Sequence, residues 1–233
     1  NVALGMYSGK AITAGCQNIM IGCDAGAAQT VGNRSIYIGV RAGLGFISDS
    51  ASYTDNIFIG RNVASKAGNG SAVTAYGNIF MGYETGCEIT SGTYNIMFGQ
   101  SVANQAAITG SYNVLMGRRA AYNLTNGSTN VLVGSSAGEA LDEGDGNTFL
   151  GHCAANTNTT GCYNVAIGYD VELPSATANN QFAIGCSTNR WITGDSSWHI
   201  QPGAGIRDTA GNLGSAGQYL CTTGSAVAWA AVS

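Results

Sequence analysis

The chain has 233 residues, of which 45% are hydrophobic and only 9% are charged, and its formal net charge is −4. This apolar content is too high for an intrinsically disordered chain. The few Lys and Arg residues form no basic patch, so we do not expect nucleic acid as a partner. No apolar run approaches the length of a membrane span, so we expect no membrane insertion.

A block of the form Asn-apolar-apolar-apolar-Gly returns along most of the chain, and its closing glycines are usually 17 residues apart. A fixed short period indicates one structural unit that must stack on its neighbours to bury its apolar face. Seventeen residues are too few for two helices, and the blocks are rich in β-branched and aromatic residues. The sequence therefore predicts an all-β fold, a parallel β-solenoid of about eleven coils. The expected strands lie in 1–5, 18–22, 35–39, 56–60, 78–82, 95–99, 113–117, 130–134, 147–151, 164–168 and 181–185.

The first residue of the block is an asparagine in most copies. Equivalent residues of stacked coils lie one strand spacing apart, so their side-chain amides can hydrogen-bond from coil to coil. The sequence therefore predicts a structural asparagine ladder. Its members are Asn18, Asn56, Asn78, Asn95, Asn113, Asn130, Asn147 and Asn164.

The middle residue of the block is apolar in every copy, and it points to the opposite face of the strand from its two neighbours. Because a single-chain coil has only one interior, we predict that these residues form an exterior stripe that joins the chains of a homotrimer. The alternative is a flattened solenoid in which the chain's own loops cover them. The predicted contact residues are Met20, Tyr37, Phe58, Phe80, Met97, Leu115, Leu132 and Phe149.

The period is interrupted in two coils and ends after Gly185. Extra residues lengthen the segments 44–53 and 65–76, and insertions in solenoids form loops that often bind ligands, although neutral loop growth is an equal alternative. We divide the chain into a repeat rod, 1–188, and a C-terminal β cap or neck, 189–233, which contains all three tryptophans. The possible receptor-contact residues are Tyr53, Tyr76, Trp191 and Trp198.

The seven cysteines include no Cys-x-x-Cys pair, so we expect mostly buried thiols and assembly in a reducing cytoplasm. A zinc site at His152, Cys153 and Cys162 would lack a fourth ligand. We therefore expect no metal and no cofactor.

Three further patterns suggest chemistry, but none of them supports an active site. The segment 134–138 matches the nucleophile elbow of hydrolases, but the corresponding corners 5–9 and 22–26 share its two glycines without the central serine, so the match is an accident of the repeat. The segment 141–147 alternates carboxylates like a calcium loop but lacks the closing glutamate. The carboxylates Asp24, Glu84 and Asp170 share a coil position but lie several coils apart, too far for glycosidase chemistry. We therefore predict that the chain is not an enzyme.

Blocks such as Asn164-Val-Ala-Ile-Gly-Tyr169 resemble the head repeats of trimeric autotransporter adhesins, and similar blocks occur in bacteriophage tail fibres. The resemblance spans residues 1–188. The segment 214–229 resembles the region that precedes an endosialidase-type self-cleaving chaperone of phage fibres. The resemblance implies a homotrimeric rod released by cleavage after a serine, which agrees with Ser233 at the end of this chain. Because the chain begins within a repeat at Asn1, we expect it to be a fragment of a longer protein.

From these patterns we expect a structural and host-receptor-binding tail fibre of a bacteriophage virion, assembled in the host cytoplasm. Its expected partners are further copies of itself, other tail proteins and a host-surface glycan or outer-membrane component. The first alternative is a bacterial trimeric surface adhesin, which a signal peptide and membrane anchor in the full gene would indicate. The second is a fibre-borne polysaccharide depolymerase, which would degrade capsular polysaccharide.

Overall fold

The computed structural model describes residues 1–47, 54–67, 73–105, 107–187, 189–197, 199–202, 218–222 and 227–231, and every regular element in these ranges is a β-strand. The strands are β1 (Val2–Leu4), β2 (Ile19–Ile21), β3 (Ile36–Ile38), β4 (Ile57–Ile59), β5 (Ile79–Met81), β6 (Ile96–Phe98), β7 (Val114–Met116), β8 (Val131–Val133), β9 (Thr148–Leu150), β10 (Val165–Tyr169), β11 (Phe182–Cys186), β12 (Asn189–Gly194), β13 (Ile200–Pro202), β14 (Gln218–Thr222) and β15 (Val227–Ala231).

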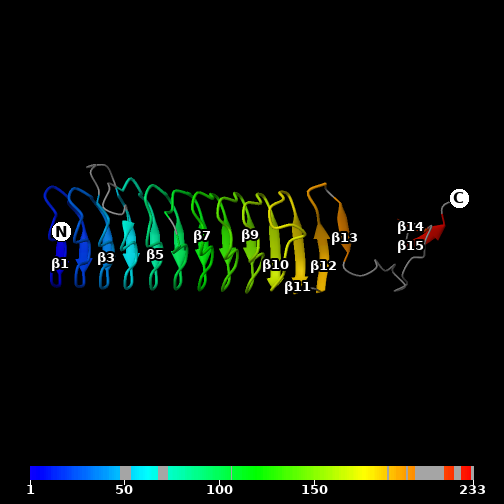
Figure 1. Ribbon diagram of the computed structural model, residues 1–233, viewed down its shortest axis with the longest axis horizontal. Coiled ribbons are helices and arrows are strands. Elements are labelled where there is room, and N and C mark those ends of the chain that lie inside the picture. Colours follow the sequence, from blue (N-terminus) through cyan, green and yellow to red (C-terminus); the bar gives the residue numbers. More distant parts are fainter. Residues whose placement is uncertain are drawn as a thin grey trace.

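Strands β1 to β11 pair in chain order, and each runs parallel to the next, so successive coils stack along one axis (Figure 1). Equivalent residues of successive repeats pair with each other: Val114 pairs with Val131, and Leu115 pairs with Leu132. The predicted parallel β-solenoid with a period of about 17 residues is therefore confirmed.

The sheet changes direction after β11. Strand β12 pairs antiparallel with β11, and β13 pairs antiparallel with β12. Strands β14 and β15 form a separate two-stranded antiparallel sheet. The parallel coils therefore end at β11, close to the expected boundary of the repeat rod at residue 188.

Each coil from 1–17 to 147–163 turns through four corners at which the backbone has positive φ. With the asparagine as position 1, the coil 113–129 has these corners at Gly117 (φ 133°), Arg119 (58°), Ala121 (48°) and Thr129 (59°). At position 5 only glycine fits, because a Cβ on Gly117 would collide with the carbonyl oxygen of Gly134 in the next coil. The glycine that closes each sequence block is thus required both by its φ and by the close stacking of coils.

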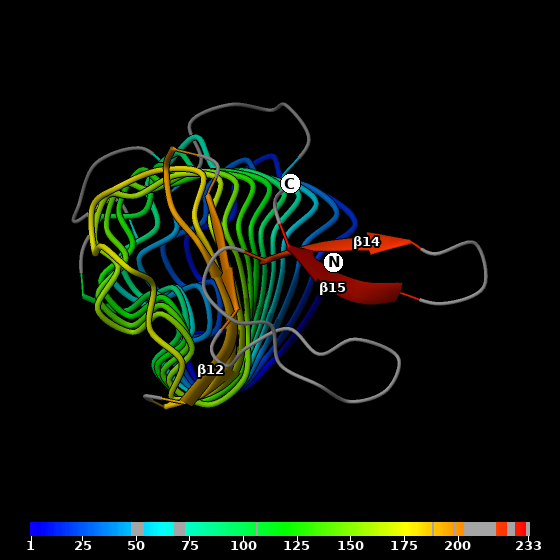
Figure 2. The same cartoon turned by 90° about the vertical axis from the view of Figure 1, so that its right-hand side faces the viewer.

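The middle residues of the strands fill the interior of the coil. Viewed along the axis, the coils superpose into a flattened loop (Figure 2), and the side chains inside it include stacked rings: the Tyr37 and Phe58 centroids are 5.3 Å apart, and those of Phe58 and Phe80 are 5.2 Å apart. The corner alanines, such as Ala120 and Ala121, are also buried in this core.

The prediction that the middle residues form an exterior contact between chains is wrong. All eight of them are at most 1% exposed within the single chain, namely Met20, Tyr37, Phe58, Phe80, Met97, Leu115, Leu132 and Phe149. In a three-residue strand the middle side chain points inward and the two flanking side chains point outward. The chain itself therefore covers these residues, as the flattened-solenoid alternative states.

Candidate functional surfaces

A ladder of buried asparagines runs along the inside of the strand corner. The side-chain oxygen of Asn113 accepts a hydrogen bond from the backbone N–H of Asn130 (2.9 Å) and another from its side-chain amide (3.1 Å). The same Asn130 amide also donates to the carbonyl oxygen of Gly144 (2.8 Å) near the end of its own coil, and the Asn130 side-chain oxygen accepts hydrogen bonds from Asn147 in the next coil. Each asparagine thus links three successive coils, which fixes their stacking register.

The same arrangement is present along the rod at the predicted ladder positions. The buried members are Asn18, Asn56, Asn78, Asn95, Asn113, Asn130, Asn147 and Asn164. Their role is structural, because they are at most 1% exposed and bond one another or the backbone.

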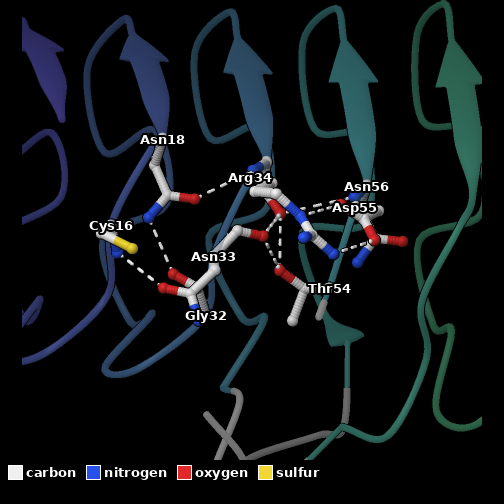
Figure 3. Close-up of polar contacts among 9 residues, drawn as sticks. Cys16, Asn18, Gly32, Asn33, Arg34, Thr54, Asp55 and Asn56 are labelled. Atoms are coloured by element: carbon white, nitrogen blue, oxygen red, sulfur yellow. Dashed lines mark hydrogen bonds and ion pairs between the residues drawn. The ribbon is translucent and has the colours of Figure 1, made fainter. Parts of the chain in front are cut away.

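The ladder has a weaker step where serine replaces asparagine. The backbone N–H of Ser35 still donates to the side-chain oxygen of Asn18 (2.9 Å), but the Ser35 hydroxyl oxygen accepts from the backbone N–H of Asn56 at the longer distance of 3.4 Å. Beside this step, Arg34 forms a two-pronged ion pair with Asp55, with N–O distances of 2.7 and 2.8 Å (Figure 3). This surface pair joins the residues directly before Ser35 and Asn56, so it lies beside the step that the short serine side chain connects poorly.

The outer face of the parallel sheet is apolar at nearly every position from β2 to β11. It consists of the two residues that flank the middle residue of each strand, and we call it the outer apolar face. None of these side chains is buried, and Ile19, Met81 and Val131 are 37%, 38% and 37% exposed. Thr148 is its one polar member from β2 to β11. The residues of the outer apolar face from β2 to β11 are Ile19, Ile21, Ile36, Ile38, Ile57, Ile59, Ile79, Met81, Ile96, Phe98, Val114, Met116, Val131, Val133, Thr148, Leu150, Val165, Ile167, Phe182 and Ile184.

A second surface feature is a row of tyrosines beside the ladder corner. The ring centroids of Tyr76 and Tyr94 are 5.2 Å apart, and those of Tyr94 and Tyr112 are 5.3 Å apart with nearly parallel planes. All three side chains are exposed. The neighbouring Tyr76 phenol, together with partial desolvation, raises the pKa of Tyr94 above its usual value.

The four predicted receptor-contact residues are not gathered by the described structure. Tyr76 is 40% exposed and belongs to the tyrosine row, whereas Trp191 is 71% exposed on β12. Tyr53 and Trp198 lie outside the described residues, as do 48–52 and 68–72 of the two lengthened segments. The sequence reasoning missed Tyr94 and Tyr112, although their spacing of 18 residues, close to the repeat, could have revealed the row.

The ionisable residues of the described ranges form no metal site, because no group of three or more His, Cys, Asp or Glu side chains comes together there. His152 stacks on the Tyr169 ring with centroids 5.1 Å apart, and Cys153 lies beside it. Burial raises the pKa of the Cys87 and Cys153 thiols, which disfavours their reactive thiolate forms.

Asp24, Glu84 and Asp170 occupy the same corner position on different coils, each with φ between 52° and 56°.

The described residues also contain no helix with the length and apolar character that crossing a membrane requires.

Comparisons with known proteins identify no relative. No protein-family model matches the chain, no curated protein matches it, and no solved structure matches it.

Proposed function

We propose that the chain is the shaft of a self-associating fibre, a structural and host-receptor-binding tail fibre of a bacteriophage virion. The observation that carries the proposal is the outer apolar face. A rigid rod with one uncharged side along its whole length is suited to join copies of itself side by side. The resemblance of the repeats to phage fibres and adhesin heads supports the assignment to an attachment fibre.

The size of the outer apolar face supports self-association. Ten strands at about 4.8 Å each extend for roughly 48 Å, and the two columns of side chains cover a width of about 10 Å. The resulting patch of roughly 500 Å² is at the upper end of what a monomeric protein usually exposes. Two such faces in contact would bury about 1,000 Å², which reaches the range of specific interfaces.

The partner that fits this face best is another copy of the chain. A second rod has the same coil spacing, so its side chains can interdigitate at every coil, whereas a globular partner would match only a few coils. The resemblance favours three copies closed around a common axis, with the outer apolar faces turned towards that axis. The contact residues of this proposed homotrimer differ from those expected from the sequence.

Sedimentation velocity tests the assembly. The purified chain should sediment as a trimer across a wide concentration range, and replacing outward isoleucines by lysine should convert it to a folded monomer. A monodisperse monomer of the unmodified chain would contradict the proposal.

The biological assignment needs a separate measurement. Antibodies against the solenoid should label the tails of virions produced from the genome that encodes the chain, and they should block adsorption to host cells. Labelling of a bacterial surface instead would identify an adhesin, and loss of capsular polysaccharide on incubation with the chain would identify a depolymerase.

A further inference from the structure

The residue before each ladder asparagine, at position 17 of the coil, always adopts a left-handed backbone conformation. In the ten coils its φ lies between 43° and 67°. Glycine and asparagine tolerate this conformation, and they occupy the position as Gly77, Gly146 and Asn180. A bulky aromatic residue is uncommon there and is not needed for the fold. Three coils nevertheless carry tyrosine, at Tyr94, Tyr112 and Tyr163.

The rings of these tyrosines lie over the preceding coil. A Cβ added to Gly77 would come within 2.7 Å of Cδ1 of Tyr94, and one added to Gly146 would come within 2.7 Å of Cδ1 of Tyr163. Tyr112 likewise lies against the ring of Tyr94, the residue one coil before it. The rings thus point in the same direction along the rod.

An interval without aromatic side chains separates Tyr112 from Tyr163. The intervening coils have Thr129 and Gly146 at position 17. Three strand spacings, about 14 Å, separate the two tyrosines, and both of them are exposed, at 58% and 63%. The ring of Tyr163 covers Gly146 and forms the C-terminal end of this interval. We call the interval, with Thr129 as its floor, the tyrosine slot.

Thr129 and Asp145 supply polar groups beside the slot. Thr129 is exposed, and its hydroxyl donates to the carbonyl oxygen of Ser128 (2.6 Å). The half-buried Asp145 carboxylate accepts the backbone N–H of Ser128 (2.7 Å) and is the charged group at this level of the column. An acidic ligand would be repelled by this carboxylate, whereas hydroxyl groups could donate to it.

We propose that the tyrosine slot binds a neutral saccharide chain. A pyranose ring has apolar C–H faces that pack on exposed aromatic rings, and a rim of hydroxyls that can bond the Thr129 hydroxyl and the Asp145 carboxylate. Because the Tyr163 ring covers Gly146, about two strand spacings, roughly 10 Å, stay open for a short saccharide segment. The row of Tyr76 and Tyr94 extends the aromatic surface towards the N-terminal coils. This inference rests on the proposed attachment role and names the class of receptor.

The test is native gel electrophoresis of the assembled chain in gels that contain dextran, laminarin or hydroxyethylcellulose, with polygalacturonate as the acidic counterpart. At least one neutral polysaccharide should retard the chain, and polygalacturonate should retard it less. Tyr112→Asn and Tyr163→Asn should each weaken retardation at least tenfold in apparent dissociation constant. Because asparagine suits a left-handed backbone, both variants should keep the melting temperature of the parent chain.

Two further variants make the test specific. Tyr7→Asn is a matched control, since Tyr7 is also exposed (58%) with φ 58° but occupies a different corner, and it should bind normally. Tyr163→Trp retains a flat aromatic face and should preserve binding. No retardation of the parent chain by any neutral polysaccharide, or unchanged retardation of the two asparagine variants, would overturn the proposal.

Sedimentation of the same samples separates this inference from the fibre proposal. A chain that forms trimers but is not retarded would overturn only the saccharide slot. A retarded monomer would overturn only the self-association.

Discussion

The inner and outer faces of the solenoid strands have similar composition but opposite environments. Inside, Phe80 and Leu115 are completely buried, whereas their neighbours Ile79 and Val114 remain partly exposed on the outer apolar face. Apolar character alone therefore does not distinguish the core of this chain from its surface. The distinction comes from strand alternation together with the position of the ladder asparagine, which lies two residues before the middle residue and faces the same way.

The largest effect is expected from a charge on the inner face. Phe80→Asp removes a ring that stacks on Phe58 and places a carboxylate in the core, which should destabilise the fold by more than about 4 kcal/mol. Circular dichroism should show loss of the cooperative thermal transition. A folded Phe80→Asp monomer with a normal melt would show that the inner face has been misidentified.

A charge on the outer face should separate assembly from folding. The double variant Ile79→Lys, Ile96→Lys should abolish self-association, because two unpaired charges would be buried at each interface. The folded monomer should lose less than about 1 kcal/mol, since these side chains already meet solvent. Sedimentation velocity and thermal melting measure the two effects separately.

The matched control for this variant is Val40→Lys, because Val40 is 45% exposed but lies outside the outer apolar face. It should leave assembly unchanged. Equal assembly of the double variant and the parent chain would exclude this face as the contact.

A smaller effect is expected in the ladder. Asn113→Ala removes the acceptor for two donors of Asn130, so it should lower the free energy of unfolding by about 1 to 3 kcal/mol. Asn113→Ser should cost less, because the hydroxyl of Ser35 shows that serine can approach the next backbone nitrogen, at 3.4 Å. Denaturant titration should therefore rank the parent chain above serine and serine above alanine. Equal stabilities would mean that the ladder contributes little.

The smallest effect is expected from a surface ion pair. Arg119 pairs with Glu139 and also lies over the ring of Tyr122, 4.3 Å from its centroid. Both charged side chains are partly exposed, so Arg119→Gln should cost less than about 1 kcal/mol and should cost still less at high salt. A larger loss in thermal melts at both salt concentrations would point to packing of the arginine on Tyr122 as its main contribution.

The repeat spacing was sufficient to predict the strands, their parallel stacking and the asparagine ladder, because one periodic constraint acts on every coil. The orientation of the middle residues was predicted wrongly, although the ladder contained the needed information. If Asn113 faces inward, Leu115 must also face inward, since alternate residues of a strand share a face. The tyrosines of the proposed slot, Tyr112 and Tyr163, are also a whole number of repeats apart, so the period contained their alignment, but the exposure of their rings came only from the structure.

The sequence by itself therefore determined the solenoid, since a 17-residue apolar period and a recurring corner glycine leave few other ways to bury the strands. Only the tertiary structure decided which apolar column is core and which is surface. It also left the rings of Tyr112 and Tyr163 exposed, about three strand spacings apart. The physical reason is that local pattern fixes periodicity, whereas inside and outside are defined only when the coil closes on itself.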